Sequence, residues 1–130
     1  MRVIFDTNIF VSALVIPESL AEKVILRIID GIDTLVLSKD ILDELLSILS
    51  AKFSRDREEI SRLAVMLSEL SEWVTPAIRL DILEDNADNR ILECAIWGRA
   101  GVIVTGDKRM LGLREYGGVK IVSLRKYLEF

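Results

Sequence analysis

The sequence predicts an α/β fold in which a mostly parallel sheet is covered by helices on both faces. Short runs rich in β-branched residues, flanked by turn or polar residues, stand at 2–5, 34–37, 102–105 and 119–122, and such runs are typical of strands. Between them, apolar residues recur at the period of an amphipathic helix. Strands that alternate with helices build right-handed βαβ units, and these units form parallel sheets.

Four stretches between these strands are expected to be helices. Their apolar positions are Leu20, Val24 and Ile28; Ile41, Leu42, Leu45, Leu46 and Leu49; Ile60, Leu63, Ala64, Leu67 and Leu70; and Ile91, Leu92, Ala95 and Ile96. Ser38 provides half of a capping signal before the second helix, and Ser54 provides a start for the third. Residues 73–85 contain Pro76 and alternate in polarity, which predicts an edge strand followed by a loop.

The composition predicts one globular domain that covers residues 1–130. A chain of 130 residues, 51% of them hydrophobic, can bury an ordinary core without disulfides. Cys94 is the only cysteine, which excludes a cysteine-rich zinc site. No apolar run reaches the length of about eighteen residues that a membrane span needs, and Asp6 interrupts the first apolar run too early for a signal peptide. We therefore expect a soluble, cytoplasmic protein without membrane contact.

The charged residues restrict the chemistry that the protein can perform. The formal net charge is -4, from 21 acidic and 17 basic residues, which argues against sequence-independent attraction to nucleic acid and requires a local basic rim in any enzyme that acts on it. The chain has no histidine. Carboxylates are therefore the groups expected to serve as acid, base or metal ligand near neutral pH.

Acidic residues stand where the carboxyl ends of parallel strands are expected, which is where ligands bind in open α/β sheets. Asp6 follows the first strand directly, and Asp107 follows the strand at 102–105 after one glycine. Asp88 precedes a predicted helix, and Glu44 lies one turn into another. Each alone fits an ordinary helix cap, turn or solvated position. Together they are the oxygen ligands that Mg²⁺ or Mn²⁺ requires.

Four motifs in the sequence resemble those of the PIN domain family. They are Asp6-Thr7-Asn8, Leu42-Asp43-Glu44-Leu45, the segment from Asp88 to Ala95, and the segment from Ile103 to Lys108, followed by a closing strand at 119–123. The resemblance spans nearly the whole chain, and it is strongest to prokaryotic stand-alone PIN proteins, many of which are toxins of VapBC-type toxin–antitoxin pairs. It implies a Rossmann-like sheet, metal-dependent cleavage of RNA, frequent dimers and, in some members, an antitoxin partner.

The resemblance also implies roles for single residues. Asp6, Asp107 and Asp88 would hold one metal ion, and Glu44 with Asp88 would contribute to a second through water; the sequence fits one ion as well as two. Asp85 is an alternative to Asp88, and Asp43 competes with Glu44.

Several neighbours of the acids are supporting candidates. Thr105 could bond a ligand or the attacking water, and Asn8 could orient Asp6, although strand-end capping explains both equally well. Lys108, Arg109 and Arg90 stand beside the acids and are candidate phosphate contacts, while solvated surface positions are equally good interpretations.

Two other functions compete with an RNA-cleaving enzyme. The first is a Mg²⁺-dependent phosphotransfer or phosphatase-like domain, but Asn8 stands where a phosphatase of that kind needs a second aspartate. The second is a catalytically silent PIN-like protein that binds RNA or acts as a scaffold. Val65 and Met66, which lie off the apolar stripe of the helix at 60–70, suit a homodimer contact as well as they suit the core.

Overall fold

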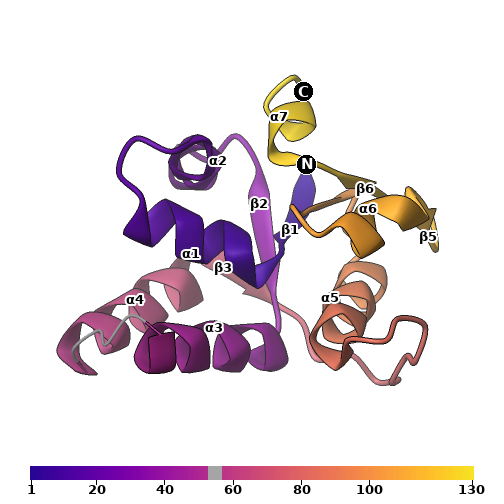
Figure 1. Cartoon of the computed structure of the whole chain (residues 1–130), viewed down its shortest axis with the longest axis horizontal. Helices are drawn as coiled ribbons and strands as arrows, with labels where there is room; N and C mark the ends of the chain where they lie inside the picture. Colours follow the sequence, from indigo (N-terminus) through magenta and orange to yellow (C-terminus); the bar gives the residue numbers. More distant parts are fainter. Residues whose placement is uncertain (53–56) are drawn as a thin grey trace.

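The computed structural model describes residues 1–52 and 57–130 and has a sheet of six strands in the order β3-β2-β1-β4-β6-β5 (Figure 1). The strands are β1 (Arg2–Phe5), β2 (Thr34–Leu37), β3 (Ser71–Trp73), β4 (Val102–Val104), β5 (Glu115–Tyr116) and β6 (Val119–Val122). The helices are α1 (Thr7–Val15), α2 (Leu20–Ile29), α3 (Lys39–Lys52), α4 (Arg57–Leu70), α5 (Asn86–Trp97), α6 (Lys108–Leu113) and α7 (Leu124–Tyr127).

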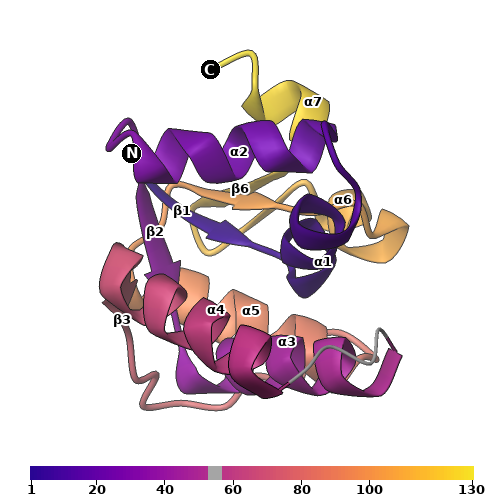
Figure 2. The ribbon, with the colours of Figure 1, turned by 90° about the vertical axis from the view of Figure 1, so that its left-hand side faces the viewer.

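All neighbouring strands from β3 to β6 run parallel, and only β5 is antiparallel, to β6. The central strands β1, β2 and β4 are almost entirely buried, as strands covered on both faces must be. Figure 2 shows α2 and α7 on one side of the sheet and α3, α4 and α5 on the other. The predicted α/β class with a mostly parallel sheet is confirmed. None of the helices in the described ranges has the length and apolarity that crossing a membrane requires.

Helices α2, α3, α4 and α5 form where the apolar spacing predicts them, whereas α1, α6 and α7 were not predicted. On α2 the buried residues are Ala21, Val24 and Ile28, and Ser19 caps the helix by accepting a hydrogen bond from the Glu22 N–H. Ser38 also caps its helix, because the Ile41 N–H donates to its hydroxyl at 3.3 Å. The proposed start at Ser54 lies outside the described residues, and α4 is described from Arg57 onward.

The segment at 73–85 differs from the prediction. The edge strand β3 begins at Ser71, directly after α4, and ends at Trp73, so that only one residue of the predicted segment lies in it. The Val74 N–H still donates to the Leu37 carbonyl at 2.9 Å, after which residues 74–85 form no helix or strand. Pro76 lacks the N–H that continued pairing would use.

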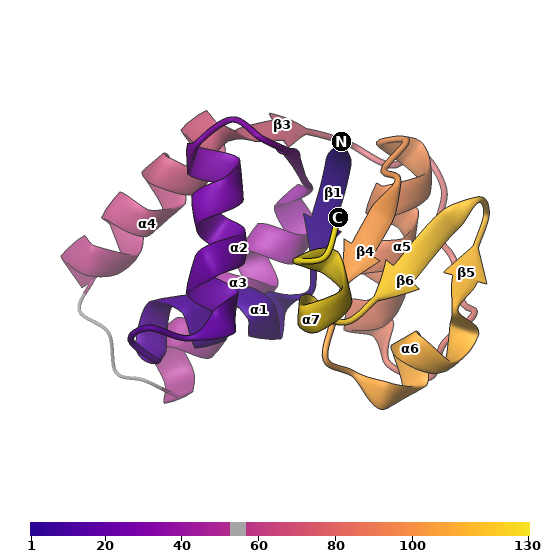
Figure 3. The same cartoon turned by 90° about the horizontal axis from the view of Figure 1, so that it is seen from above.

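Figure 3 shows the carboxyl-terminal part of the chain beside β4, where β5 and β6 form a hairpin. Gly117 and Gly118 make its two-residue turn with φ of 58° and 84°, values at which a side chain is strained. Beyond this hairpin, the Tyr127 hydroxyl on α7 donates to the buried Asp33, which also pairs with the Met1 amine at 3.2 Å and with Arg27 at 3.2 Å. This cluster joins α7 and α2 to the start of β2.

Candidate functional site

The carboxyl ends of β1 and β4 bring Asp6 and Asp107 to either side of a buried threonine. Asp6 follows β1 and is 5% exposed. The Thr105 hydroxyl donates a hydrogen bond to Asp6 Oδ2 at 2.7 Å and accepts one from the Asp107 N–H at 3.0 Å. Because Thr105 is fully buried, it fixes the two acids relative to each other.

Both of these aspartates cap the helix that follows them. The Asn8 N–H donates to Asp6 Oδ1 at 3.4 Å, and the N–H groups of Arg109 and Met110 donate to Asp107 Oδ1 at 2.8 and 3.0 Å. Asn8 itself is exposed and reaches Asp6 through its backbone, a contact that almost any residue can make at this position. Within the described residues, Asp107 Oδ2 accepts no hydrogen bond, so this oxygen is free for another ligand.

Asp88 lies in the first turn of α5, and its carboxylate is 7% exposed. In the described part of the chain, neither of its oxygens accepts a hydrogen bond. Burial raises the pKa of Asp88 to about 7, with further contributions from the negative charges of Asp6, Asp85 and Asp107. Asp88 therefore shares an electrostatic environment with the other two aspartates, and its charge is poorly compensated.

The pKa of Asp6 is shifted in the same direction for related reasons. Burial raises it most, the hydrogen bonds from Thr105 and from the Asn8 N–H lower it, and the charge of Asp107 raises it again. The net effect is a raised pKa. Like charges brought close together in a buried site favour protonation or the binding of a cation.

The alternative ligands have other contacts. Asp85 caps α5 by accepting from the Ala87 N–H at 2.9 Å, and its side chain lies on the exposed rim next to Asp88. Asp43 Oδ2 pairs with Lys39 Nζ at 2.6 Å on the exposed face of α3. Glu44 is exposed on the same helix and has no contact with the three aspartates among the described residues. The charges of Asp6, Asp88 and Asp107 thus influence one another, whereas no hydrogen bond or ion pair joins Glu44 to them within the described residues.

The three aspartates do not form a ready-made metal cage. Across residues 1–52 and 57–130, no group of three acidic or cysteine side chains is placed to hold a metal ion. The donor types nevertheless fit a hard cation such as Mg²⁺ or Mn²⁺, which takes oxygen ligands. The free Oδ2 of Asp107 and the unbonded carboxylate of Asp88 are the oxygens that such an ion would use first.

Comparison with known proteins identifies the fold family. Residues 2–109 match the profile of the PIN domain. The chain belongs to the PIN domain family. A relative is the uncharacterized protein MJ1680 of Methanocaldococcus jannaschii, which is 29% identical over 119 residues, or 88% of this chain and 76% of that protein.

Two solved structures share the fold of this PIN domain. One is VapBC2 from Rickettsia felis bound to a DNA fragment from their promoter, with a TM-score of 0.65, 23% identity and coverage of 95% of this chain and 98% of that chain. The other is VapBC-1 from nontypeable Haemophilus influenzae, with a TM-score of 0.64, 20% identity and coverage of 96% and 99%. At this identity the likeness shows the fold.

The basic side chains next to the acids of this PIN domain differ in whether they already form ion pairs. Lys108 is exposed and forms no ion pair within the described chain. An Arg109 guanidinium nitrogen lies 3.0 Å from Glu84 Oε2, and both side chains are exposed. Arg90 turns away from the site, because its guanidinium donates to the Leu80 carbonyl at 2.9 Å and pairs with Glu93 at 2.9 Å. Arg90 thus acts as an anchor for the segment 74–85.

Two buried polar residues of α5 that the sequence did not single out hold the same segment. Asn89 accepts hydrogen bonds from the N–H groups of Ile82 and Leu83 and donates to the Leu83 carbonyl at 2.8 Å. Glu93 accepts from the Leu80 N–H at 2.5 Å and pairs with Arg90 and Arg79. Both side chains are almost fully buried. In the sequence, their spacing of four residues among the apolar positions of α5 indicates that both lie on one face of this helix.

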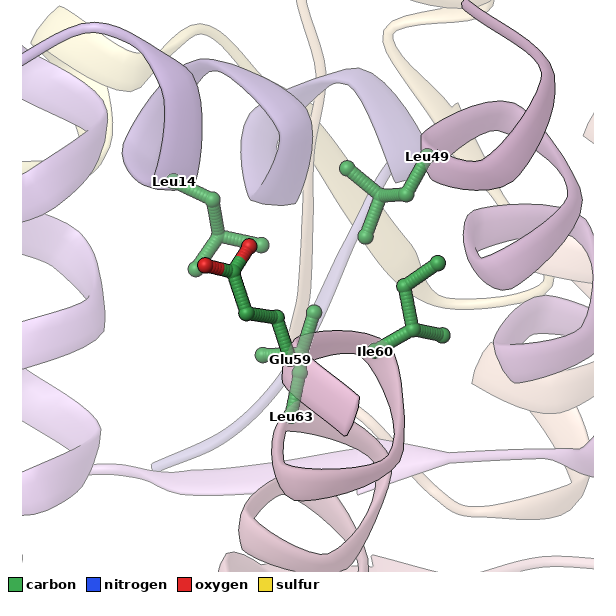
Figure 4. A pocket seen from close by; sticks show the side chains of 5 residues that line it. All are labelled: Leu14, Leu49, Glu59, Ile60 and Leu63. Carbon is green, nitrogen blue, oxygen red and sulfur yellow. The ribbon is translucent and has the colours of Figure 1, made fainter. Parts of the chain in front are cut away.

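A separate apolar pocket lies away from the acids. It has a volume of about 190 Å³ and lies between α1, α3 and α4 (Figure 4); its lining residues are Leu14, Leu49, Glu59, Ile60 and Leu63. A smaller cavity of about 60 Å³ next to it shares Leu14 and Leu63 and extends to Glu22 and Ile25 on α2. We call these two cavities the apolar groove. Among the described residues, its walls carry the acids Glu22 and Glu59 but no cation, and they offer apolar surface to a partner.

Proposed function

We propose that this PIN domain is a metal-dependent endoribonuclease that uses Mg²⁺ or Mn²⁺ to hydrolyse RNA phosphodiester bonds. The observation that supports the proposal is that Asp88 is buried, accepts no hydrogen bond within the described residues and is influenced by the charges of Asp6 and Asp107 from two other segments. Such an arrangement is costly in the absence of a cation.

The roles of the residues follow from their contacts. A bound dication would polarise the scissile phosphate and lower the pKa of a water molecule. Asp88 and Asp107 Oδ2 supply uncommitted oxygens, and Thr105 holds Asp6 and Asp107 in register. Lys108, and Arg109 once it leaves its exposed partner Glu84, are the cations proposed to contact substrate phosphates. Glu44 stays a proposed contributor through water, since it forms no direct hydrogen bond with the aspartates within the described residues.

The decisive test is cleavage of a mixed RNA panel with Mn²⁺, with and without EDTA. We expect Asp88→Asn and Asp6→Asn to abolish the Mn²⁺-dependent cleavage. Asp30→Asn is the matched control, because it removes the same charge at an exposed position after α2. Full activity of the Asp6→Asn, Asp88→Asn double variant would eliminate the proposal. Hydrolysis of p-nitrophenyl phosphate without RNA cleavage would favour the phosphatase-like alternative. The absence of both activities would favour a silent binding protein.

We also propose an antitoxin-type protein partner for the apolar groove. The two solved structures of this fold are titled VapBC2 and VapBC-1, and the groove combines an apolar floor with the carboxylates of Glu22 and Glu59. These features suit a partner segment with apolar and basic side chains. The product of a small reading frame beside the gene, purified separately, should inhibit RNA cleavage. Leu14→Asp should relieve the inhibition.

A homodimer is a separate proposal that concerns the outer face of α4. Val65 is 57% exposed there, whereas Met66 packs against the core. Val65→Asp should therefore shift the sedimentation coefficient of the free protein toward that of a monomer, while leaving inhibition through the groove unchanged. An unchanged coefficient would remove Val65 from the dimer contact.

A further inference from the structure

We propose that the Glu84 carboxylate competes with the substrate for Arg109: it pairs with the Arg109 guanidinium until an RNA phosphate displaces it. This inference deepens the proposed ribonuclease function and rests on it. Arg109 stands in the first turn of α6, two residues after Asp107, and its guanidinium lies 3.0 Å from Glu84 Oε2. Its side chain is 71% exposed and that of Glu84 is 84% exposed, so both groups are accessible to a ligand.

Arg109 lies close enough to the acids to act on a substrate held there. Its positive charge is among the influences on Asp88, where it opposes the effect of the neighbouring carboxylates. The backbone of Arg109 is fixed as well, because its N–H donates to Asp107 Oδ1 at 2.8 Å. A phosphate next to the scissile bond would therefore lie within reach of this guanidinium, which is suited to bidentate contact with phosphate.

The position of Glu84 is determined by the anchored part of the segment 74–85. On one side, the Leu83 N–H donates to the buried Asn89 at 2.8 Å; on the other, Asp85 caps α5 through the Ala87 N–H at 2.9 Å. The carboxylate of Glu84 is thus presented to Arg109 by a backbone that is held on both sides. The backbone that carries Glu84 is thus held, while the side chains of Glu84 and Arg109 are exposed.

The other arginines of this region each have a buried partner, although Arg79 also lies 3.0 Å from the partly exposed Asp40. Arg79 and Arg90 both pair with Glu93, whose side chain is 1% exposed. Removing an arginine from a buried carboxylate leaves that charge without compensation, which is strongly unfavourable. Glu84 can be solvated by water when Arg109 leaves it, and an exposed pair of this kind contributes little. Arg109 is therefore the arginine here that can exchange its partner at low cost.

The test is the affinity for a fluorescein-labelled single-stranded RNA of about ten nucleotides, measured by anisotropy in EDTA over a range of salt concentrations. Glu84→Gln should tighten binding about two- to fivefold at low salt, which is the range for releasing an exposed ion pair. Arg109→Gln should weaken binding and reduce the slope of log affinity against log salt by about 0.7, the value for one phosphate contact on a single strand. In the Arg109→Gln background, Glu84→Gln should have no further effect.

The matched control is Asp81→Asn, which removes the same charge from an exposed position of the same segment, where no ion pair is formed within the described residues. The inference is overturned if Glu84→Gln gains no more than Asp81→Asn, if it weakens binding, or if its gain persists without Arg109. Because binding is measured without metal, these results stand apart from turnover. RNA cleavage that depends on Asp88, with no effect of Glu84→Gln on binding, would refute the competitor and retain the ribonuclease. Absence of RNA binding by the wild type in EDTA would overturn the competitor, whereas the ribonuclease is refuted only by the absence of Mn²⁺-dependent cleavage.

Discussion

Replacement of Asp88 by asparagine should stabilise the metal-free protein at neutral and alkaline pH while abolishing its activity. Burial and the neighbouring charges raise the pKa of Asp88 from 3.8 to about 7. A shift of about three units corresponds to about 4 kcal/mol of unfavourable free energy for the ionised form in the folded protein. We expect about half of this as the net gain for Asp88→Asn, because the amide that replaces the carboxylate is itself buried without a hydrogen bond.

The pH dependence of the effect has a definite sign. The folded-state pKa of Asp88 lies above that of the unfolded chain, so the folded protein binds the proton more tightly. The contribution of Asp88 to the free energy of unfolding is therefore most favourable below about pH 4 and declines by about 1.4 kcal/mol per unit until about pH 7. Asparagine does not titrate. The advantage of Asp88→Asn should thus be largest at pH 8 and disappear toward pH 4.

The assay is urea unfolding in EDTA at pH 4.5, 6 and 8, with Asp30→Asn as the exposed control. If the slope of unfolding free energy against urea concentration is the same for the wild type and the variant, the substitution has changed stability and not the surface exposed on unfolding. Addition of Mn²⁺ should stabilise the wild type through mass action, and more at pH 8 than at pH 6, because the metal competes with the proton at Asp88. If Asp88→Asn lowers stability by the same amount at every pH, the reasoning about its charge is wrong.

Three further predictions concern the other fixed side chains. Millimolar Mn²⁺ should raise the thermal midpoint of the wild type more than that of Asp6→Asn; equal shifts would contradict binding at Asp6. Thr105→Val should destabilise the protein by about 1–3 kcal/mol and lower cleavage, whereas Thr105→Ser should retain both; equal losses in the two variants would point to packing rather than to the hydroxyl. Although burial acts against it, the hydrogen bond from Tyr127 and the ion pairs with the N-terminal amine and Arg27 hold the pKa of Asp33 below its usual value. The ionised Asp33 therefore stabilises the folded protein above about pH 4, and this contribution is lost in more acidic solution. In chemical denaturation from pH 6 to pH 2, the free energy of unfolding should fall less for Asp33→Asn than for the wild type. An equal fall in both proteins would exclude this role.

The sequence predicts the sheet well because its strands are short and buried on both faces. Each such strand needs a run of β-branched residues, so the segments at 2–5, 34–37 and 119–122 can be read directly. The acids at the ends of β1 and β4 follow from the same logic, since parallel strands present their carboxyl ends at one edge. The predicted strand at 102–105 ends one residue early, at Val104, and Thr105 becomes the bridge between the acids.

What the sequence did not predict depends on contacts between distant segments. Arg90 is an example. Its place next to Asp88 in the sequence suggests a phosphate contact, but its guanidinium forms an ion pair with the buried Glu93, one turn later. The segment 74–85 has no periodicity that would place it, because its backbone is held by side chains of α5 rather than by its own pattern. The pairing of Glu84 with Arg109, 25 residues apart, likewise emerges only when that segment is packed.

The aspartates can cap helices and bind a metal ion at the same time, because the two oxygens of one carboxylate can have different partners. Capping uses Oδ1 of Asp6 and Oδ1 of Asp107, and Thr105 uses Oδ2 of Asp6. The oxygens without a hydrogen bond in the described chain are Oδ2 of Asp107 and both oxygens of Asp88. The capped aspartates are therefore stabilised by the fold whether or not a cation is present, whereas Asp88 accepts no hydrogen bond within the described residues and is compensated only in part by the positive charge of Arg109. The dependence of stability on pH should consequently be largest at Asp88, whose pKa is raised to about 7, and a substitution at Asp6 should alter the pH profile of unfolding less than one at Asp88 does.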